Sequence, residues 1–588
     1  MAEKTLVQIF RNRAYAWPQK TAFRYRVGGK YKDFSWQQSW LEIEELTHGL
    51  SALGVARGER VGILSRNRPE WIYSDLALMM LGAISVPLYV NSAVEQLEYI
   101  MRDAGIRVVI TEQAQLEKLF ELEARLGQLE KVVIDAAEGK QPGIISFGRV
   151  KNLGCQVSVS IDRLVEESKE DAPATLVYTS GTTGQPKGAV LSQRNFVTGC
   201  RSARSVLPTR EGDLALSFLP LGHVYERFVT YSNLDKGVIV AFAQSPETVV
   251  RDLVAVRPTV IFGVPRFYDR LYGRILAAVS RRSGFGRGLF WLAFGLARGR
   301  AKRLMRGERV PFFANLLYPL ADLLVFSKLR KRLGGRIRFL VSGGAPLTAE
   351  VTTFFWSAGL PLFQGYGLTE SCSVCSVNNF DNFNLEGVGK PCPGVEVKIA
   401  SDGEILLKGG VVFQEYWRNP SATAAAKKDS WLHTGDVGWL NREGFLVITD
   451  RKKDLIVTSL GENVSPQKIE SILKAGTFIS EAVVFGDNRP YLTGLIWLDL
   501  DALTEYARAK GILFKRPEEL VENPWVCAEL KAIIAEKNQR LAPYERIRKY
   551  KLLDQDFSSL AGELTPTMKV RRKVVAKKYG AFIEAMYR

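Results

Sequence analysis

A stretch rich in hydroxyls and glycines, YTSGTTGQPKGAV at residues 178–190, contains the residue types best suited to bind a polyanion. Small hydroxyls and backbone amides left uncovered by glycine donate hydrogen bonds to phosphate oxygens, and Lys187 adds a positive charge. The spacing is not that of a P-loop NTPase, because counting from Gly181 places Pro186 where a glycine is required and Gly188 where a hydroxyl is required. We therefore expect a phosphate-binding loop of another kind.

Six further motifs follow this loop along the chain. They are LPLGHVYER (219–227), SGGAPL (342–347), QGYGLTES (364–371), HTGD (433–436), DRKKD (450–454) and ELTPTMK (563–569). With the loop, they closely resemble in type and order the motifs of the adenylate-forming superfamily, which includes acyl-CoA synthetases, nonribosomal-peptide adenylation domains and luciferases. The forms LPLGHVYER, FGVPRFYDRLY and GENVSP resemble the long-chain acyl-CoA synthetase branch. The resemblance covers nearly the whole chain.

The resemblance implies a binding site for ATP. The phosphate loop would wrap the β- and γ-phosphates with Thr179, Ser180, Gly181, Thr182, Thr183, Gly184 and Lys187. The SGGAPL and QGYGLTES motifs would surround adenine and the adenylate with Gly343, Gly344, Ala345, Gln364, Gly365, Tyr366, Gly367 and Thr369. Tyr366 would stack on adenine, Asp436 would accept two hydrogen bonds from the ribose diol, and Arg451 would support the same ribose.

The resemblance also implies the residues that act on the reacting groups. Glu370, with Thr182, would hold Mg²⁺, a hard cation that prefers oxygen ligands and bridges phosphates. His223 would face the carboxylate of the acid. Lys569 would bridge that carboxylate and the α-phosphate, which brings two anions together. The expected catalytic residues are therefore Lys569, His223 and Glu370.

The resemblance implies two successive reactions: the acid is first joined to AMP, and the acyl group is then transferred to the thiol of coenzyme A. One position of a small domain cannot serve both reactions. The resemblance implies a C-terminal domain that swings about Lys453, withdrawing Lys569 and bringing the loop that contains Gly461 against the pantetheine channel of coenzyme A. Some relatives have a lysine shortly after the hinge and a tryptophan in the next loop. This sequence has Val457 and Asn463 at these two positions. The contacts that the lysine and the tryptophan make with the nucleotide in those relatives are therefore not carried over to this chain.

Short β-branched runs alternate with helical stretches over most of the chain, which predicts an α/β fold with mainly parallel sheets and flanking helices. Near residue 450 the pattern changes to that of a small α+β domain. We predict an adenylation domain at residues 1–449 and a mobile C-terminal domain at residues 450–588 that carries the catalytic lysine. The fragment GFGRG at residues 284–288 lacks a preceding strand and the third glycine of a dinucleotide fingerprint, so it is predicted to be a turn.

The net charge of +18 is concentrated in one segment, since residues 281–338 contain fifteen lysines or arginines and two acids. An insertion at about 281–335 alternates arginine-rich clusters with aromatic and leucine-rich patches, as a helix on anionic lipid does. Core helices with solvated ends are the alternative. The segment lacks polar base-reading residues, so nucleic acid is not expected as a partner. We expect a cytoplasmic protein that contacts the inner face of a membrane peripherally.

Six sparse cysteines suit a reducing compartment, and Cys372 and Cys375 are expected to be packing residues rather than zinc ligands. The resemblance implies an AMP-forming acyl-CoA synthetase that uses ATP, Mg²⁺ and coenzyme A to activate a long-chain fatty acid. Three alternatives stay open: an acyl–carrier-protein ligase, a ligase for aryl or terpenoid acids, and a non-enzymatic sensor of lipid or nucleotide. Chain-length preference, oligomeric state and pathway are left undetermined.

Overall fold

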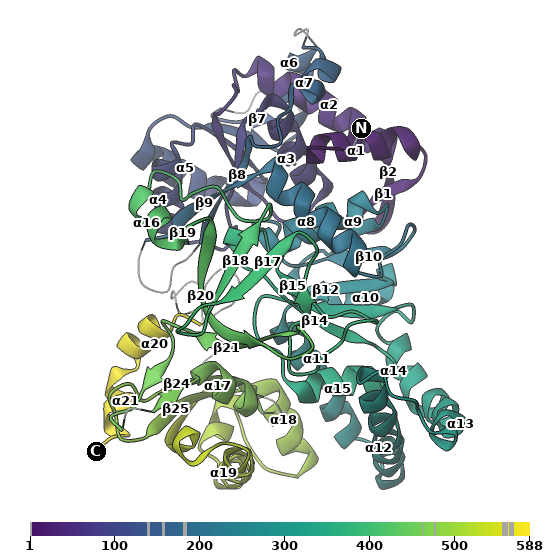
Figure 1. Ribbon diagram of the computed structural model, residues 1–588, viewed down its shortest axis with the longest axis vertical. Helices are drawn as coiled ribbons and strands as arrows, with labels where there is room; N and C mark the ends of the chain where they lie inside the picture. The colour runs from purple at the N-terminus through teal and green to yellow at the C-terminus, as the bar shows by residue number, and fades with distance from the viewer. Residues whose placement is uncertain are drawn as a thin grey trace.

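The computed structural model describes residues 3–137, 142–155, 159–179, 185–460, 462–474, 478–554, 563 and 570–588. In these residues the chain forms two large sheets, of nine and seven strands, in which most neighbouring strands run parallel (Figure 1). The nine-stranded sheet runs, in spatial order, β16 (Lys390–Pro391), β15 (Ser376–Val377), β14 (Leu362–Tyr366), β13 (Phe339–Ser342), β12 (Val260–Gly263), β10 (Leu214–Ser217), β11 (Ile239–Phe242), β1 (Thr21–Val27) and β2 (Lys30–Ser35). The α/β prediction is confirmed.

The seven-stranded sheet ends in an antiparallel hairpin that carries the phosphate loop. Its order is β7 (Ile145–Ser146), β6 (Glu130–Val133), β5 (Val108–Thr111), β3 (Arg60–Leu64), β4 (Ile84–Pro87), β8 (Pro173–Thr179) and β9 (Lys187–Ser192). Central strands such as β4 and β5 are buried throughout, as expected where helices cover both faces of a parallel sheet.

Helices connect the strands at the positions that the hydrophobic pattern predicts. The helix between β3 and β4, for example, starts with Pro69 in its first turn and ends at Gly82, which has a left-handed backbone. The helices of the first 450 residues are α1 (Leu6–Ala16), α2 (Trp36–Ala52), α3 (Pro69–Leu81), α4 (Val94–Ala104), α5 (Leu116–Leu126), α6 (Phe147–Gly154), α7 (Ile161–Glu167), α8 (Gln193–Val206), α9 (Val224–Asp235), α10 (Val249–Val256), α11 (Pro265–Ser280), α12 (Gly284–Met305), α13 (Phe312–Ala321), α14 (Ser327–Lys331), α15 (Ala349–Ser357) and α16 (Pro420–Ala426).

One local prediction is wrong. The glycine-rich fragment at residues 284–288 is not a turn but the first turns of α12, where Ser283 caps the helix by accepting a hydrogen bond from the Gly286 amide. A serine cap satisfies a free amide at the helix start, and the apolar residues that follow bury one side of the helix, which together outweigh the weak helix propensity of glycine.

An antiparallel sheet follows the nine-stranded sheet in the chain and lies at the centre of Figure 1, in green. Its strands are β17 (Val395–Ile399), β18 (Glu404–Gly409), β19 (Lys427–Lys428), β20 (Trp431–Leu440) and β21 (Leu446–Arg451). Because β20 and β21 pair directly, residues of the HTGD and DRKKD motifs are brought opposite each other.

The C-terminal region builds hydrophobic clusters of its own, all of whose members follow residue 455. Its elements are β22 (Ile456–Val457), β23 (Asn463–Val464), α17 (Pro466–Lys474), β24 (Ile479–Phe485), β25 (Leu492–Leu498), α18 (Leu500–Ala509), α19 (Pro524–Gln539), β26 (Ile547–Leu553), α20 (Arg572–Lys578) and α21 (Gly580–Ala585). Strand β26 lies parallel to β25, an addition that the sequence pattern did not predict. The boundary at residue 450 stays a prediction.

Candidate active site

The β8–β9 hairpin positions both ends of the phosphate loop. Thr179, the last residue of β8, lies opposite Lys187, the first residue of β9, and its hydroxyl donates a hydrogen bond to the Lys187 carbonyl at 3.4 Å. The loop residues Ser180, Gly181, Thr182, Thr183 and Gly184 lie outside the described residues. The hairpin thus presents Thr179 and Lys187 together at the mouth of the loop.

Glu370 and Tyr416 connect this hairpin to the QGYGLTES motif. Glu370 lies in the 3₁₀ turn Thr369–Ser371, directly after β14, and its Oε1 accepts a hydrogen bond from the Tyr416 hydroxyl at 2.6 Å. The Lys187 ammonium lies 5.3 Å from the centre of the Tyr416 ring, which is within cation–π range. Burial, followed by the charge of Glu370, raises the pKa of Tyr416, so this phenol stays protonated and donates.

Asp436 is the centre of a second cluster. Its Oδ2 accepts a hydrogen bond from the Tyr366 hydroxyl at 2.6 Å, and its Oδ1 accepts one from Arg451 Nε at 2.9 Å. Asp436 on β20 and Arg451 on β21 are directly paired in the sheet. Burial would lower the pKa of Arg451, but the charges of Asp436 and Glu370 and the hydrogen bond to Asp436 raise it. The charge of Glu370 thus reaches Arg451, which links the two clusters electrostatically.

His223 caps the N-terminus of α9. Its Nδ1 accepts the backbone amide hydrogen of Tyr225 at 3.1 Å, so in the neutral ring the proton is on Nε2. The preceding loop is held by Asn67, which donates to the Leu219 carbonyl at 2.6 Å and accepts from the Leu221 amide at 2.9 Å. The position of His223 is therefore fixed by the helix and by the loop before it.

One helical turn after His223, Arg227 forms a fully buried ion pair with Asp75 of α3, with N–O distances of 2.5 and 2.8 Å. Its guanidinium also donates to the hydroxyls of Thr175 on β8, at 2.7 Å, and Ser85 on β4, at 2.9 Å. A charge can be buried at this depth only when its donors are satisfied. Arg227 thereby fixes α9, and with it His223, against the seven-stranded sheet that carries the phosphate loop.

Close packing explains a glycine in each of two further motifs, SGGAPL and QGYGLTES. Gly343 follows β13, and a side chain there would approach the Tyr225 ring to 3.0 Å. A side chain on Gly367 would lie 2.2 Å from the Ser373 backbone, which no residue with a Cβ can satisfy. Gly344 and the exposed Ala345 complete the turn after β13, while Gln364 and Gly365 belong to β14.

The expected hinge follows β21. The Lys452 amide donates to the Gly435 carbonyl at 2.8 Å, and its ammonium binds Asp402 at 2.6 Å and Glu404 at 3.0 Å. Lys453 is exposed at the next position. Val457 and Asn463, the departures from some relatives, pair with each other in β22–β23. Gly461 and Lys569 lie outside the described residues.

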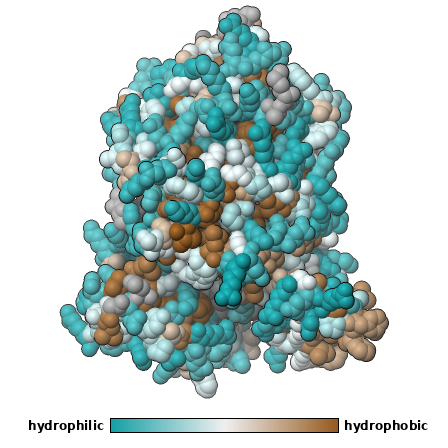
Figure 2. Space-filling view, in the orientation of Figure 1, coloured by the Kyte–Doolittle hydropathy of each residue, from teal (hydrophilic) through white to brown (hydrophobic). Residues whose placement is uncertain are grey.

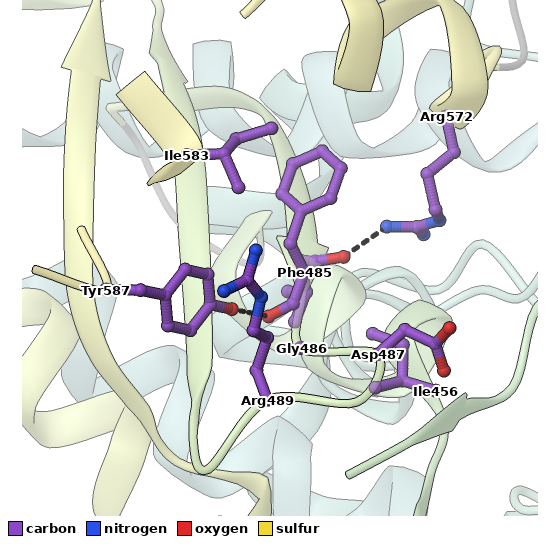
Figure 3. A pocket seen from close by; sticks show the side chains of 9 residues that line it. Ile456, Phe485, Gly486, Asp487, Arg489, Arg572, Ile583 and Tyr587 are labelled. Atoms are coloured by element: carbon purple, nitrogen blue, oxygen red, sulfur yellow. Dashed lines mark hydrogen bonds between the residues drawn. The ribbon is translucent and has the colours of Figure 1, made fainter. Parts of the chain in front are cut away.

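The C-terminal region contains a cavity of about 180 Å³ (Figure 3). Two arginines line it, but Arg489 pairs with Glu584 and Arg572 pairs with Glu470. The Tyr587 hydroxyl donates to the Phe485 carbonyl at 3.1 Å. These contacts attach the end of the chain to β24, and none of the predicted site residues lines this cavity.

Comparisons with known proteins agree with this geometry. The family described as AMP-binding enzyme matches residues 10–417, and the AMP-binding enzyme C-terminal domain matches residues 453–588. The chain therefore belongs to the AMP-binding enzymes of the adenylate-forming superfamily. It is 36% identical to the long-chain-fatty-acid–CoA ligase FadD15 of Mycobacterium tuberculosis, over 97% of this chain and 95% of the relative. It is 31% identical to the peroxisomal long chain acyl-CoA synthetase 6 of Arabidopsis thaliana, over 96% and 83%.

Solved structures show the same fold. The adenylation domain of a carboxylate reductase from Mycobacterium chelonae aligns with a TM-score of 0.78 at 22% identity, over 99% of this chain and 91% of that one. The anthranilate CoA ligase AuaEII, in complex with anthranoyl-AMP, aligns with a TM-score of 0.72 at 21% identity, over 98% and 97%. At these identities the likeness concerns the fold alone.

The structure thus brings together Thr179, Lys187, Tyr366, Glu370, Asp436 and Arg451 in two linked clusters, and places His223 on a separate, rigid helix start. The sequence analysis did not predict Tyr416 or the Arg227–Asp75 pair. Tyr416 lies outside the six motifs, and a single tyrosine beside a turn gives no local signal of its own. Arg227 lies in one of the motifs, but its partner is 152 positions away.

Proposed function

We propose that this protein is a long-chain fatty acid–CoA ligase. The observation that carries the proposal is the 31–37% identity, over nearly the whole chain, to proteins named as ligases or synthetases of that class. The two linked clusters support it, because they hold the residue types that an adenylate-forming reaction needs at the positions expected from the motifs.

In the first reaction, an oxygen of the fatty carboxylate attacks the α-phosphorus of ATP, and the bond to the β-phosphate oxygen breaks to release pyrophosphate. Both reactants are anions, so the site must position them and offset their charge. The phosphate loop and Lys187 would bind the outgoing phosphates. Asp436 and Arg451 would hold the ribose, His223 would face the carboxylate, and Lys569 would lie between the carboxylate and the α-phosphate.

The residues present fit a magnesium ion. Glu370 supplies one carboxylate, whose Oε1 accepts a hydrogen bond from the Tyr416 hydroxyl at 2.6 Å. Mg²⁺ usually binds through one or two carboxylates together with substrate phosphates. Glu370, with Thr182 of the loop, would therefore hold it, and when bound it would supply positive charge to the phosphate oxygens.

In the second reaction, the sulfur of coenzyme A attacks the acyl carbonyl carbon of the adenylate. A carbon–sulfur bond forms, the bond to the phosphate oxygen breaks, AMP leaves with the electron pair, and the thiol proton passes to solvent. The C-terminal region would rotate about Lys453 between the two reactions, and the loop containing Gly461 would then line the pantetheine channel.

A panel of acids tests the proposal directly. Fatty acids of increasing chain length, an aryl acid and a terpenoid acid are each supplied with ATP and magnesium, with and without coenzyme A, while AMP release and acyl-CoA are measured. We expect coenzyme A-dependent AMP release that is far greater with palmitate-length acids than with the aryl or the terpenoid acid. Asp436→Asn should abolish most of it by weakening ribose binding, whereas Asp429→Asn, at an exposed acid of the neighbouring loop, should not.

The other outcomes each contradict the assignment. Adenylate formation without acyl-CoA would indicate a ligase that serves a carrier protein. A strong preference for the aryl or terpenoid acid would indicate a different substrate class. Folded protein that formed no adenylate with any acid would indicate a sensor rather than an enzyme.

A further inference from the structure

Helix α13 exposes an apolar surface to solvent. Phe312, Phe313 and Leu316 are 74%, 73% and 60% exposed, and Leu317 and Leu320 are exposed as well. Leu323 and Leu324, in the π-helical turn Asp322–Phe326 that follows α13, extend this exposed surface. Residues 310–321 contain no charged side chain. Figure 2 shows this surface as a brown area at lower right, where Figure 1 places α13. Contiguous exposed patches of this kind are rare on soluble monomers and mark interaction sites.

By length and composition alone, Phe312–Lys331 is the one helical segment among the described residues that could cross a bilayer, and its most apolar 18 residues are only 11% buried. The fold nevertheless argues against a crossing. The charge-free helix itself has 10 residues, about 15 Å, while the hydrocarbon core is about 30 Å thick. Its far end is attached to the domain, because Phe326 is buried and Arg330 binds both Asp322 and the Ala358 carbonyl.

The near end is also fixed. Arg300 of α12 lies 4.3 Å from the Tyr318 ring centre and donates to Asn315 at 3.2 Å. Helices α12 and α13 therefore form a hairpin whose second arm has its inner side on α12 and its outer side in solvent. A hairpin of this kind fits a surface that it enters shallowly, with the helix axis parallel to that surface.

Positive charge surrounds the apolar helix. Exposed basic residues precede it on α12 and in the connecting turn, and follow it on α14; they are Arg298, Lys302, Arg303, Arg306, Arg309, Lys328, Lys331 and Arg332. Glu308 is the one acid in the connection, 3.7 to 3.8 Å from its arginine partners. Apolar residues inside a basic rim complement an anionic lipid surface, which attracts the basic residues while the apolar ones enter it.

We propose that the α12–α13 hairpin docks the protein on an anionic bilayer, with the outer side of α13 in the interface and the basic residues against the headgroups. This inference goes beyond the ligase activity and does not depend on it. A second copy of the chain is a poorer occupant, because a self-complementary contact would bring two basic rims together and like charges repel.

Co-sedimentation with vesicles tests the docking. Wild-type protein should bind phosphatidylglycerol-containing vesicles and lose binding at high salt, since exposed charges are screened. Phe312→Ser, Leu316→Ser and Leu320→Ser together should lower the partition coefficient at least about tenfold, because they remove the inserted side chains. Leu513→Ser with Trp525→Ser is the matched control, since these apolar residues, 93% and 76% exposed, lie in the C-terminal region. The control should bind as wild type does.

A second variant isolates the charges. Arg303→Gln, Arg306→Gln and Arg309→Gln should lower binding to the anionic vesicles at least about tenfold and leave the weak binding to phosphatidylcholine vesicles unchanged. Arg163→Gln with Arg516→Gln, at exposed arginines elsewhere, is the control. Both docking variants should unfold at the wild-type melting temperature, which shows that they fold, and should keep wild-type activity on a soluble medium-chain acid.

Hydrogen exchange places the contact. Amides of residues 311–324 should exchange more slowly when vesicles are added, without ATP or fatty acid present. Unchanged exchange there, or unchanged vesicle binding by the serine variant, would overturn the proposal. So would a wild-type dimer that the serine variant converts to a monomer, since the surface would then be covered by a second copy. Vesicle binding without ligase activity would leave the docking intact and contradict the proposed function alone.

Discussion

At the scale of single residues, the site is a set of side chains that hold one another in place before any nucleotide is bound. Tyr416 fixes Glu370 and receives Lys187 on its ring, while Asp436 fixes Tyr366 and Arg451. Both oxygens of Asp436 are already engaged. A carboxylate offers about four lone-pair sites, so it still has acceptor capacity for a ribose diol. Preorganisation of this kind lowers the cost of binding a multiply charged ligand.

Tyr416→Phe tests the first of these contacts. The change removes one hydrogen bond to Glu370, so the carboxylate loses its fixed orientation. Hydrogen bonds to charged groups are worth about 1.5–3 kcal/mol, so we expect MgATP binding to weaken roughly 10- to 100-fold. Calorimetric titration of the protein with ATP, with and without magnesium, measures this.

The magnesium-free titration is the internal comparison for Tyr416→Phe, because it should change much less. Tyr15→Phe, at a tyrosine that is 63% exposed, is the control and should titrate as wild type. Equal weakening with and without magnesium would mean that Tyr416 shapes the pocket and does not orient Glu370.

Most of these site residues could be predicted from the sequence, because each lies in a short motif whose residue types suit the binding of phosphate or ribose. The sequence could not show that Tyr366 and Asp436 are hydrogen-bonded, since 70 residues separate them. Nor could the sequence indicate Tyr416, because its role depends on Glu370, which the fold brings beside it. The roles of Lys569, Gly461 and residues 180–184 stay predictions.

At the scale of elements, α9 carries His223, the residue that is expected to face the acid. His223 caps it, Tyr225 packs on Gly343, and Arg227 attaches it to the seven-stranded sheet. Glu226 in the same turn is 2% exposed, and burial raises its pKa to about 8, although a hydrogen bond with Ser217 lowers it somewhat. This carboxyl is therefore protonated in the folded protein at neutral pH.

Glu226→Gln should change the pH dependence of stability. The folded pKa lies above the ordinary value of 4.5, so between about 4.5 and 8 the folded state binds more protons than the unfolded state. Wild-type stability therefore falls as pH rises through this window and levels off above it. The variant lacks this loss. The difference in unfolding free energy between variant and wild type should therefore shift in favour of the variant from about pH 5 to about pH 9, by on the order of a few kcal/mol.

Urea denaturation at the two pH values measures the gain. The unfolding free energies of wild type and variant should converge toward acid pH. If the two stability curves instead run parallel, the pKa of Glu226 is the same in the folded and unfolded states. The prediction would then be wrong.

Elements were the most predictable level of this fold. Short β-branched runs that end in turn residues, at 60–91, 104–112, 259–267 and 336–347, predict strands and, in the first run, a helix between two strands. The structure has β3, α3, β4, β5, β12 and β13 there. The glycine-rich start of α12 was mistaken for a turn because propensity is a weak local preference that packing overrides. Strand β26 was missed because its alternation is mostly between charged and half-buried residues.

At the scale of the whole molecule, the contacts between the C-terminal region and the helices of the nine-stranded sheet include two exposed ion pairs. Arg281 pairs with Glu505, and Arg540 lies 3.5 Å from Glu350. Exposed pairs contribute little, typically under 1 kcal/mol each. The rotation proposed for the C-terminal region would break these two pairs at little cost in free energy.

Lys569→Ala separates the two poses. Acid-dependent pyrophosphate exchange should fall by roughly 100-fold or more, because a positive charge between two anions is lost. Conversion of supplied acyl-AMP and coenzyme A to thioester should stay nearly unchanged, because the lysine has withdrawn by then. Lys573→Ala, at an exposed lysine in α20, is the control. Equal loss in both half-reactions would contradict the two-pose mechanism.

The buried pair of Arg227 and Asp75 constrains how this sequence can vary. Replacing either residue alone strands a charge in the interior, which typically costs 3–5 kcal/mol, whereas exchanging both for apolar residues of similar size is often neutral. A single-step mutational path between the two states passes through a poorly folded intermediate. Libraries that diversify α9 to alter acid preference should therefore leave position 227 fixed, or randomise it jointly with position 75.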